Sequence, residues 1–375
     1  MAGHPTFGVE EEFLLVDPDC GEPVPLNTRV AVLAEDDGVD LQLELTSCQV
    51  ETATEVSDNT ADLRAQLTRL RRIAGDAANK AGARLLAAGL PPTVPHEFPI
   101  TESERYGRIA DRFGMVAHEQ GICGCHVHVA VPDRDAAIQV SNRLRPWLPL
   151  LLGMTANSAI YRNDDSGYAS FRQVLWSRWP SAGPPPHFDS AEDYDAAVQR
   201  MQDIGAMLDD GMVYWDIRPS ANFPTVEVRV ADVPATVADT VLHATLTRAA
   251  VMTALDEERR GVPLPDVRAH ELAGAYWSSA RYGLDGPAVD PFSDGGKGTG
   301  PAADLLRALV DRIAPALRTV GDFEFVEDEL ARLFERGNGA QRQRAAWLRR
   351  GEAADVIDAV AEATVEDCDQ RREGM

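Results

Sequence analysis

Positive charge is scarce in this chain of 375 residues, which has 36 Lys and Arg against 60 Asp and Glu and a formal net charge of −24. Binding to nucleic acid requires clustered Lys and Arg that neutralise phosphates. The composition therefore argues against a nucleic-acid partner. It does not argue against a nucleotide, because a nucleotide needs only a local cationic pocket or bound metal ions.

Long hydrophobic runs are also missing. The longest run, around Trp147 to Met154, is far too short to cross a bilayer as a helix. The first residues, MAGHPTFGVEEEF, contain no basic region followed by an apolar stretch, so we do not expect a signal peptide. These two features predict a soluble, cytoplasmic protein with no membrane partner.

Cysteines are few and scattered. The chain has five of them, an odd number without a repeated spacing, which fits reduced thiols in a cytosol better than a disulfide framework. Cys123 and Cys125 lack a second C-x-x-C pair or a spaced His pair, so we interpret them as packing residues and not as zinc ligands. The glycines around Lys297 likewise do not match the spacing of a phosphate-binding loop, and no strand precedes them.

Acidic residues stand where a buried strand is predicted. The segment from Gly8 to Val16 is apolar and β-prone at its end, and alternation along a strand sends Glu10 and Glu12 to the same face. Two carboxylates about 7 Å apart on one face repel each other unless solvent or a cation separates them. A divalent metal is the simplest compensation, and a solvated acidic strand is the alternative.

A second acidic pair follows in two short strand-like segments, residues 41–45 and 48–51. Glu44 and Glu51 are separated by an odd number of positions, so a single straight strand would point them to opposite faces. A turn or bulge between the segments would return them to a common face. Ordinary surface acids on two half-exposed strands remain the alternative.

Two further strands carry candidate ligands. In the strand Gly124 to Val131, His126 and His128 share a face, and imidazole is a common ligand of divalent metals and a donor to phosphate. In the strand 224–232, Glu227 and Arg229 point together with Thr225. Either Glu227 completes a metal site while Arg229 binds a phosphoryl group in transfer, or the two residues form a cross-face ion pair of little energetic worth.

A long segment rich in aromatics and arginines lies between these strands, from Tyr161 to about Pro186. Long loops in compact domains are often functional, and the aromatics make disorder an unsuitable interpretation. Arg162, Arg172 and Arg178 are the cationic groups that this acidic chain could offer to an anionic ligand, or else they are solvated loop residues.

Helical periodicity dominates the remainder of the chain. Helices are predicted over residues 60–80, 101–120, 133–158, 191–208, 237–259, 302–317, 326–334 and 353–365, and short strands over residues 83–90 and 214–219. We therefore expect an α+β protein of one domain, residues 1–375, that is mostly helical from about residue 237.

Several of these motifs, taken in order, resemble one known family. The motifs are Gly8-Val9-Glu10-Glu11-Glu12-Phe13, the Glu44 and Glu51 pair, Gly124-x-His126-Val127-His128-Val129, the 165–186 loop, Glu227-Val228-Arg229, and the segments 280–286 and 337–340. Together they are similar to the carboxylate-amine ligase family, also called type 2 glutamate-cysteine ligases, over essentially the whole chain. The resemblance implies a glutamine synthetase-like fold, in which an antiparallel catalytic sheet is flanked by helices.

The resemblance also implies a reaction and its partners. In that superfamily ATP phosphorylates a substrate carboxylate, and an amine then attacks the acyl phosphate, with Mg²⁺ or Mn²⁺ bridging the phosphates. It implies glutamate-cysteine ligase activity giving γ-glutamylcysteine, in a homodimer with small-molecule substrates. A ligase for another amino acid or amine, and a non-catalytic nucleotide-binding protein of the same fold, are the alternatives.

By motif position the resemblance also implies roles for individual residues. It places Glu12, Glu44 and Glu51 on one metal ion, and Glu10, His126 and Glu227 on another. It assigns Arg229 to the phosphoryl group in transfer, with Glu227 beside it. His128, Arg162 and Arg172 are the further candidates for contacts with ATP or the substrate carboxylate.

Overall fold

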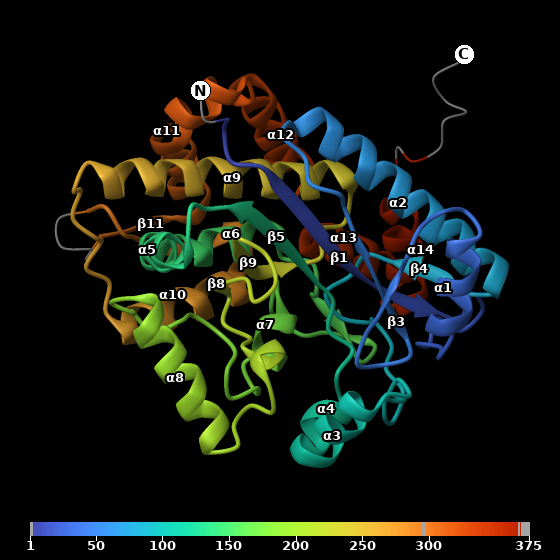
Figure 1. Ribbon diagram of the computed structural model, residues 1–375. Helices are drawn as coiled ribbons and strands as arrows, with labels where there is room; N and C mark the ends of the chain where they lie inside the picture. Colours follow the sequence, from blue (N-terminus) through green and yellow to red (C-terminus); the bar gives the residue numbers. More distant parts are fainter. Residues whose placement is uncertain (1–2, 294–297, 367, 369–375) are drawn as a thin grey trace.

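A seven-stranded sheet forms the centre of the structure, a computed structural model that describes residues 3–293, 298–366 and 368 (Figure 1). Its strand order is β2-β3-β1-β5-β9-β8, and β4 pairs with β1 outside this path. Every strand pairing in the sheet is antiparallel. The expected antiparallel sheet flanked by helices is therefore confirmed. Near Lys297, residues 294–297 lie outside the described residues, whereas Gly298 begins a strand. A strand over Pro287–Asp290 also precedes this segment, so the expectation that no strand precedes it was wrong.

The first strand, β1 (Phe7–Val16), organises the sheet. One of its edges pairs with β3 (Gln49–Ala53), and the other pairs with β5 (Gly124–Ala130) and then with β4 (Arg84–Leu86). The sheet continues from β5 through β9 (Thr225–Asp232) to β8 (Ile217–Pro219), and β2 (Gln42–Leu43) closes the opposite side. Segments far apart in the sequence are thereby brought side by side.

One face of the sheet packs on the main hydrophobic core. Alternate residues of the central strands, among them Val9, Val127 and Val228, lie in a single cluster with residues of α9 (Val237–Arg259). Figure 1 shows α9 running across the sheet, and α11 (Ala302–Val320) and α12 (Phe323–Arg336) extend this layer. Burial of these apolar side chains provides the main driving force for this packing.

A buried ion pair fixes β1 on this same face. Glu11 accepts hydrogen bonds from Nε and Nη2 of Arg71 in α2 (Thr60–Ala81), at 3.0 and 2.6 Å, and both side chains are fully buried. Arg71 also donates to the carbonyl oxygens of Pro234, Ala235 and Thr364. The charge of Glu11 is thus compensated inside the core, while Glu10 and Glu12 point to the opposite face.

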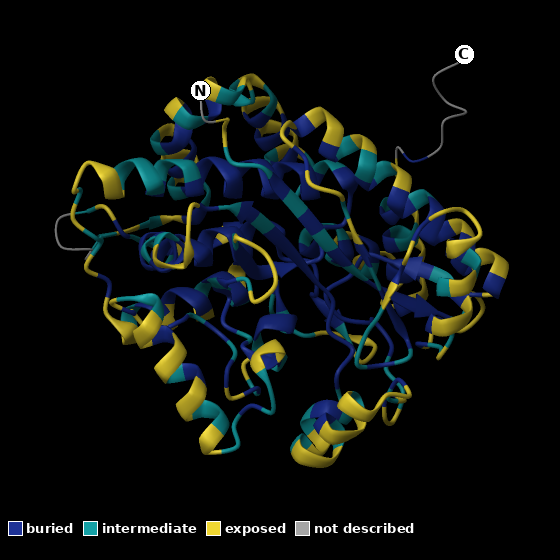
Figure 2. Ribbon diagram, viewed as in Figure 1, coloured by how far each residue is buried: buried dark blue, intermediate teal, exposed yellow. Residues whose placement is uncertain are grey.

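The opposite face is bordered by smaller, peripheral elements. An aromatic-rich cluster there contains residues from α3 (Glu104–Phe113), α7 (Phe171–Trp176) and α8 (Ala191–Asp203). Figure 2 shows that the strands at the centre are buried, whereas α3 and α8 expose much of their surface. This is also the face to which Glu10 and Glu12 of β1 point.

The remaining elements complete the layers on both sides. They are α1 (Asn27–Glu35), α4 (Met115–His118), α5 (Arg134–Leu144), α6 (Leu148–Thr155), α10 (Ala269–Tyr282), α13 (Gly339–Arg350), α14 (Ala353–Thr364), the 3-10 turns at 145–147, 210–212 and 283–285, and the hairpins β6 (Ile160–Tyr161)/β7 (Asp164–Asp165) and β10 (Pro287–Asp290)/β11 (Gly298–Pro301).

Several predicted elements differ from those observed. The helix expected over 101–120 is broken at Gly114, which has a φ of 54°. The helix expected over 133–158 is divided into α5 and α6 by a 3-10 turn that contains Pro146, because proline removes a backbone donor. The segment interpreted as a long loop contains α7, and the strand expected over 83–90 is only three residues long. Among the described helices, none is both long and apolar enough to cross a membrane.

Candidate active site

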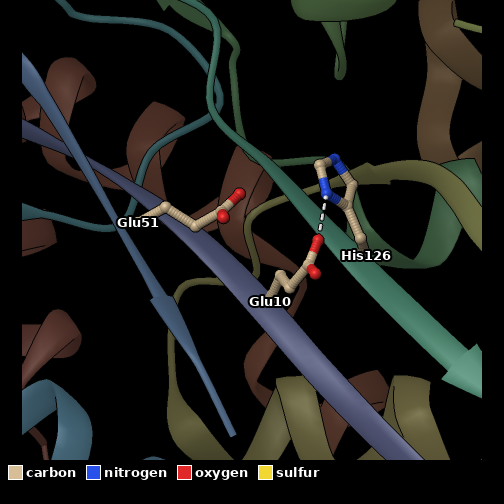
Figure 3. Close-up of side chains that lie close together, drawn as sticks. All are labelled: Glu10, Glu51 and His126. Carbon is tan, nitrogen blue, oxygen red and sulfur yellow. Dashed lines mark hydrogen bonds and ion pairs between the residues drawn. The ribbon is translucent and has the colours of Figure 1, made fainter. Parts of the chain in front are cut away.

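The face of the sheet turned away from α9 carries a cluster of carboxylates and imidazoles. Figure 3 shows Glu10 from β1, Glu51 from β3 and His126 from β5 directed into the same space. The ligand-type atoms of these three residues lie within 4.8 Å of one another. They come from three neighbouring strands, so the pairing of the strands itself brings them together.

A second group consists only of carboxylates. Glu12, Glu44 and Glu51 each offer an oxygen within 4.8 Å of the others. Glu12 and Glu51 are direct cross-strand partners, and Glu44 follows the end of β2. A turn in which the Gln49 amide donates to the carbonyl of Thr46 reverses the chain between Glu44 and Glu51. The turn predicted from the odd spacing is therefore present, and all three side chains share one face.

A third group unites Glu10, His128 and Glu227, again with ligand-type atoms within 4.8 Å of one another. His128 Nε2 lies 3.4 Å from Glu10 Oε1 and 4.0 Å from Glu227 Oε1. Its Nδ1 lies 3.0 Å from the hydroxyl of Thr225, which fixes the orientation of the ring. His126 Nδ1 in turn lies 3.2 Å from Glu10 Oε2, so Glu10 connects both imidazoles.

The grouping of these residues differs from the expected one in a single respect. Glu227 was expected to accompany His126, whereas the structure groups Glu227 with His128 and groups His126 with Glu51. The cause is the register of β5 and β9, in which His128 and Glu227 are direct partners. A β-bulge next to Cys125 and Val127 shifts the pairing beyond that point.

Two arginines neutralise Glu227. Arg218, its cross-strand partner in β8, donates from Nε to Glu227 Oε2 at 2.8 Å and from Nη2 to Oε1 at 3.2 Å. Arg229 Nη1 donates to Glu227 Oε1 and lies 3.3 Å from His126 Nδ1. Arg229 thus stands between a carboxylate and an imidazole of the cluster, and its side chain is almost completely buried.

Electrostatics divides the cluster into two unlike parts. Burial and the nearby charge of Glu12 raise the pKa of Glu44 to about 8, and burial together with Glu44 raises the pKa of Glu51 well above its usual range. Burial also opposes ionisation of Glu10 and Glu227. There, hydrogen bonds with His126 and His128 lower the pKa of Glu10, and Arg229 and Arg218 lower the pKa of Glu227. The Glu44 and Glu51 side is therefore the one that requires an additional positive charge.

Gly124, which begins β5, is required by close packing. Its amide donates to Glu12 Oε2 at 2.6 Å. A Cβ atom at this position would lie 2.6 Å from Arg172 Nη2 and 3.2 Å from His126 Nε2. The absent side chain therefore leaves room for an arginine and a histidine of the cluster to lie against the backbone.

The other predicted arginines occupy different environments. Arg172 is buried in α7, 3.8 Å from Asp232 Oδ1 and next to His126 across Gly124. Arg162 lies in the turn between β6 and β7, where its side chain is 56% exposed and 3.6 Å from Glu119. The described contacts of Arg162 do not connect it to the carboxylate and imidazole cluster, whereas Arg172 lies next to His126 of that cluster.

Sequence reasoning missed Asp216, Arg218 and a nearby cavity. The strand predicted over 214–219 contained a usable signal, because alternation places Asp216 and Arg218 on the same face. A cavity of about 410 Å³ adjoins Arg218, and Tyr194, Val198 and Ser220 are among its lining residues. No spacing in the sequence indicated this cavity, since α8 and the end of β8 enclose it only after folding.

Comparisons with known proteins agree with this architecture. The model of a protein family described as glutamate-cysteine ligase family 2 matches residues 6–362. A protein of Mycobacterium sp. strain KMS with the provisional name glutamate-cysteine ligase 2-2 is 68% identical over 365 residues, which cover 97% of this chain and 100% of the relative. A protein of Mycolicibacterium smegmatis with the provisional name glutamate-cysteine ligase 2-3 is 66% identical over 365 residues, with the same coverage.

A solved structure shares the fold at low sequence identity. Glutamate-cysteine ligase from Francisella tularensis, determined in complex with AMP, superposes with a TM-score of 0.68 at 15% identity and covers 98% of this chain and 90% of its own. At such identity the likeness concerns the fold alone. It agrees with the antiparallel sheet described above.

Proposed function

The chain belongs to the glutamate-cysteine ligase family 2, and from this premise we propose that it joins the γ-carboxylate of glutamate to the amine of cysteine at the expense of ATP. The carboxylate attacks the γ-phosphorus of ATP and ADP leaves, which forms an acyl phosphate. The amine then attacks the acyl carbon, and phosphate leaves with the bonding electron pair while the amine loses a proton. The products are the amide, ADP and phosphate.

Carboxylates and imidazoles in this arrangement suit Mg²⁺ or Mn²⁺. The group Glu12, Glu44 and Glu51 offers only hard oxygen atoms, which both ions prefer. Burial and the charges of neighbouring carboxylates raise the pKa values of Glu44 and Glu51, and a bound cation would offset both effects. The group Glu10, His128 and Glu227 includes an imidazole, which Mn²⁺ accepts more readily than Mg²⁺. Bound divalent ions would neutralise the phosphate charges of ATP.

Arg229 is the residue proposed to stabilise the phosphoryl group in transfer. It is buried, positively charged and in contact with Glu227 and His126, so its guanidinium is held in place before the reaction begins. A preorganised donor stabilises developing charge without further reorganisation. Arg218 holds Glu227 from its other side and keeps this carboxylate ionised.

The observation that carries the proposal is that ligand-type residues from different strands come together on one face of the sheet. Glu10, Glu12, Glu51, His126 and Glu227 come from four strands and lie on one face of an antiparallel sheet, in a chain of this family. A protein that only binds a nucleotide has no need of this set of ligand-type residues together with a buried arginine. The cavity beside Arg218, whose guanidinium donates to Glu227, has room for an amino acid.

The test is a substrate screen combined with carboxylate replacements. ADP release is measured with Mg²⁺ and with Mn²⁺, using glutamate with cysteine and then a panel of amino acids and amines, and mass spectrometry identifies each product. Glu12→Gln and Glu227→Gln are expected to lower turnover at least about a hundredfold, since each removes a charge from the reacting centre. Circular dichroism verifies that both variants fold.

Glu22→Gln, at an exposed position, is the matched control and should retain wild-type turnover. If product forms with a different amine and not with cysteine, that amine is the acceptor and the ligase reaction stands. Wild-type turnover in Glu12→Gln or Glu227→Gln would remove that residue from the site. If no substrate pair gives ADP with either ion, the chain is a nucleotide-binding protein of the same fold.

The same family membership supports a cytoplasmic homodimer as the working form. Light scattering coupled to size-exclusion chromatography measures the mass in solution. A mass of about one chain, whose own mass is 40.7 kDa, would contradict the dimer.

A further inference from the structure

A buried polar group lies beside the carboxylate cluster, and Arg229 is the only one of its members that the reaction proposed above uses. We call it the Asp216 group, and it comprises Arg172 and Gln173 of α7, Asp216, Arg229 of β9, and Tyr276 of α10. All five are buried, and Asp216 is completely inaccessible to solvent. Two helices and the residue before β8 therefore supply the polar side chains that accompany Arg229 in this group.

The backbone places Asp216 directly next to Arg229. The amide of Arg229 donates to the carbonyl of Asp216 at 2.7 Å, and the amide of Asp216 donates to the carbonyl of Gly183 at 2.9 Å. Alternation from Ile217, which lies in the core under the sheet, puts the Asp216 side chain on the same face as Arg218. The position of this carboxylate is thus set by strand pairing and not by a mobile loop.

The polar atoms of this group are unusually poor in direct partners. Both carboxylate oxygens of Asp216, Nε of Arg172, Nε of Arg229, Oε1 of Gln173 and the hydroxyl of Tyr276 are buried without a hydrogen-bond partner among the described residues. Buried polar atoms in folded proteins nearly always have a partner. Donors and acceptors that lie near one another in this way interact through a bridging water or by a small movement of the side chains.

Charge indicates which members of the group act on one another. Burial raises the pKa of Asp216 to about 6, and the opposing influences are the charges of Arg172 and Arg229 and the side chains of Tyr276 and Gln173. An aspartate that faces two arginines in a low-dielectric interior attracts both strongly. Its loss would leave Arg229 attracted only towards the carboxylate cluster, above all towards Glu227.

We propose that Asp216 is a positioning residue, which holds the guanidinium groups of Arg229 and Arg172 in place from the side opposite the carboxylate cluster. For Arg229 this role rests on the ligase reaction proposed above, in which the guanidinium must stand ready for the phosphoryl group. Asp216 itself touches neither substrate nor metal. Its negative charge offsets the attraction that Glu227 exerts on the Arg229 guanidinium from the other side.

The kinetic test compares Asp216→Asn with Tyr276→Phe. Asp216→Asn keeps the shape and removes the charge, and we expect kcat to fall about tenfold or more, because small displacements of a catalytic group are costly, while KM for ATP stays within about twofold. Tyr276→Phe should lower kcat in the same direction but less. The double variant should lose less than the product of the two single losses, since both changes act on one group.

A second measurement does not depend on turnover. In protein labelled with ¹⁵N at arginine, the Nε–Hε signals of Arg172 and Arg229 are assigned from Arg172→Lys and Arg229→Lys and followed by NMR. Asp216→Asn should shift both signals, whereas the exposed control Asp111→Asn should leave both in place. If Asp216→Asn does not fold, Tyr276→Phe is expected to shift the same two signals by a smaller amount.

The two measurements separate this inference from the ligase assignment. Unchanged kcat in a folded Asp216→Asn enzyme, or arginine signals that move no more than in Asp111→Asn, would overturn the positioning role. If Asp216→Asn folds only in part, an unchanged kcat per folded enzyme would overturn the role as well. Absence of ADP in the wild-type screen would instead remove the ligase function, and the NMR shifts would still decide whether Asp216 holds the arginines.

Discussion

Arg229, Arg172 and Arg162 show how burial decides what an arginine can do. Arg229 is enclosed between Glu227 and His126, and Arg172 is buried near Asp232. Arg162 is 56% exposed and faces Glu119, so water screens most of its interaction with that carboxylate. Of the three, only Arg229 and Arg172 lie beside the carboxylate cluster.

This difference leads to a prediction for Arg229. Arg229→Lys keeps the charge but loses the planar guanidinium that contacts both Glu227 and His126. We expect kcat to fall about a hundredfold, with a change of less than about fivefold in ATP affinity, because the lost interaction belongs to the transition state. Steady-state kinetics and calorimetric titration with a non-hydrolysable ATP analogue measure the two quantities.

The matched control is Arg162→Lys, which should change neither kcat nor ATP affinity because its side chain is mainly solvated. A variant Arg229→Lys that binds the ATP analogue weakly but turns over normally at saturation would contradict the assigned role. Arg229 would then be a nucleotide-binding residue only.

Alternation along strands was enough to identify most of the candidate residues. It placed Glu10 with Glu12, His126 with His128 and Glu227 with Arg229, and the structure brings all six to one face. It could not assign partners between strands, because cross-strand pairing depends on a register and on a bulge that leave no local pattern.

At the scale of elements, β5 shows how closely the site is packed. Gly124 opens this strand and lies directly under the side chains of Arg172 and His126. Gly124→Ala adds a Cβ 2.6 Å from Arg172 Nη2, a distance at which something must move. We expect turnover to fall at least about tenfold, with a destabilisation of about 1–3 kcal/mol from overpacking.

Gly107→Ala is the control for this change. Gly107 lies within α3, and a Cβ there would meet nothing within 4 Å. We expect it to leave turnover unchanged and to stabilise the protein by about 0.5–1 kcal/mol, because alanine favours helix. Urea unfolding and ADP release measure both variants. Equal effects of the two substitutions would exclude the packing explanation.

Secondary structure could be predicted best where the signal was long and continuous. The helix expected over 237–259 coincides with α9, and the predicted strands at Glu10 and His126 are β1 and β5. Four of the described helices were missed. The short helices α1 and α7 leave little periodicity, whereas α10 and α13 are longer and lie in segments that were interpreted as connections between helices. Tertiary contacts, not local propensity, therefore determine these segments.

At the scale of the whole molecule, the raised pKa values of two site carboxylates make the stability of the fold depend on pH. Glu44 has a pKa of about 8 in the folded protein against an ordinary 4.5, and the pKa of Glu51 is raised as well. The folded state therefore binds protons that the unfolded state releases, and this contribution to stability is present below about pH 4.5 and lost as pH rises towards 8. A divalent ion would replace the missing positive charge.

The prediction compares wild type with the double variant Glu44→Gln/Glu51→Gln in thermal unfolding. With a chelator, wild type should lose stability relative to the double variant as pH rises from about 5 to 8. Saturating Mn²⁺ should raise the wild-type melting temperature by several degrees, more at pH 8 than at pH 6, since protons compete for the same oxygens. The double variant should lose most of this Mn²⁺ effect.

The comparison between the two proteins is necessary because other buried groups titrate in the same range. Burial lowers the pKa of His243 to about 4, so its contribution has the opposite sign and is lost as pH falls from about 6.5 towards 4. It is present in both proteins and cancels in the difference. If wild type instead gains stability over the double variant as pH rises, positively charged groups of the protein, and not bound protons, neutralise Glu44 and Glu51.

The three consecutive glutamates of β1 have a consequence for the evolution and engineering of this chain. Glu11 bonds Arg71 inside the core, and its two neighbours lie on the opposite face of the sheet, in the carboxylate cluster. A deletion or insertion that shifted the three glutamates by one position in the register would exchange these roles, leaving two acids in the interior with Arg71 as their only partner and one acid on the other face. We therefore expect insertions and deletions within β1 to be harmful, whereas those in the segment before β1 should be tolerated.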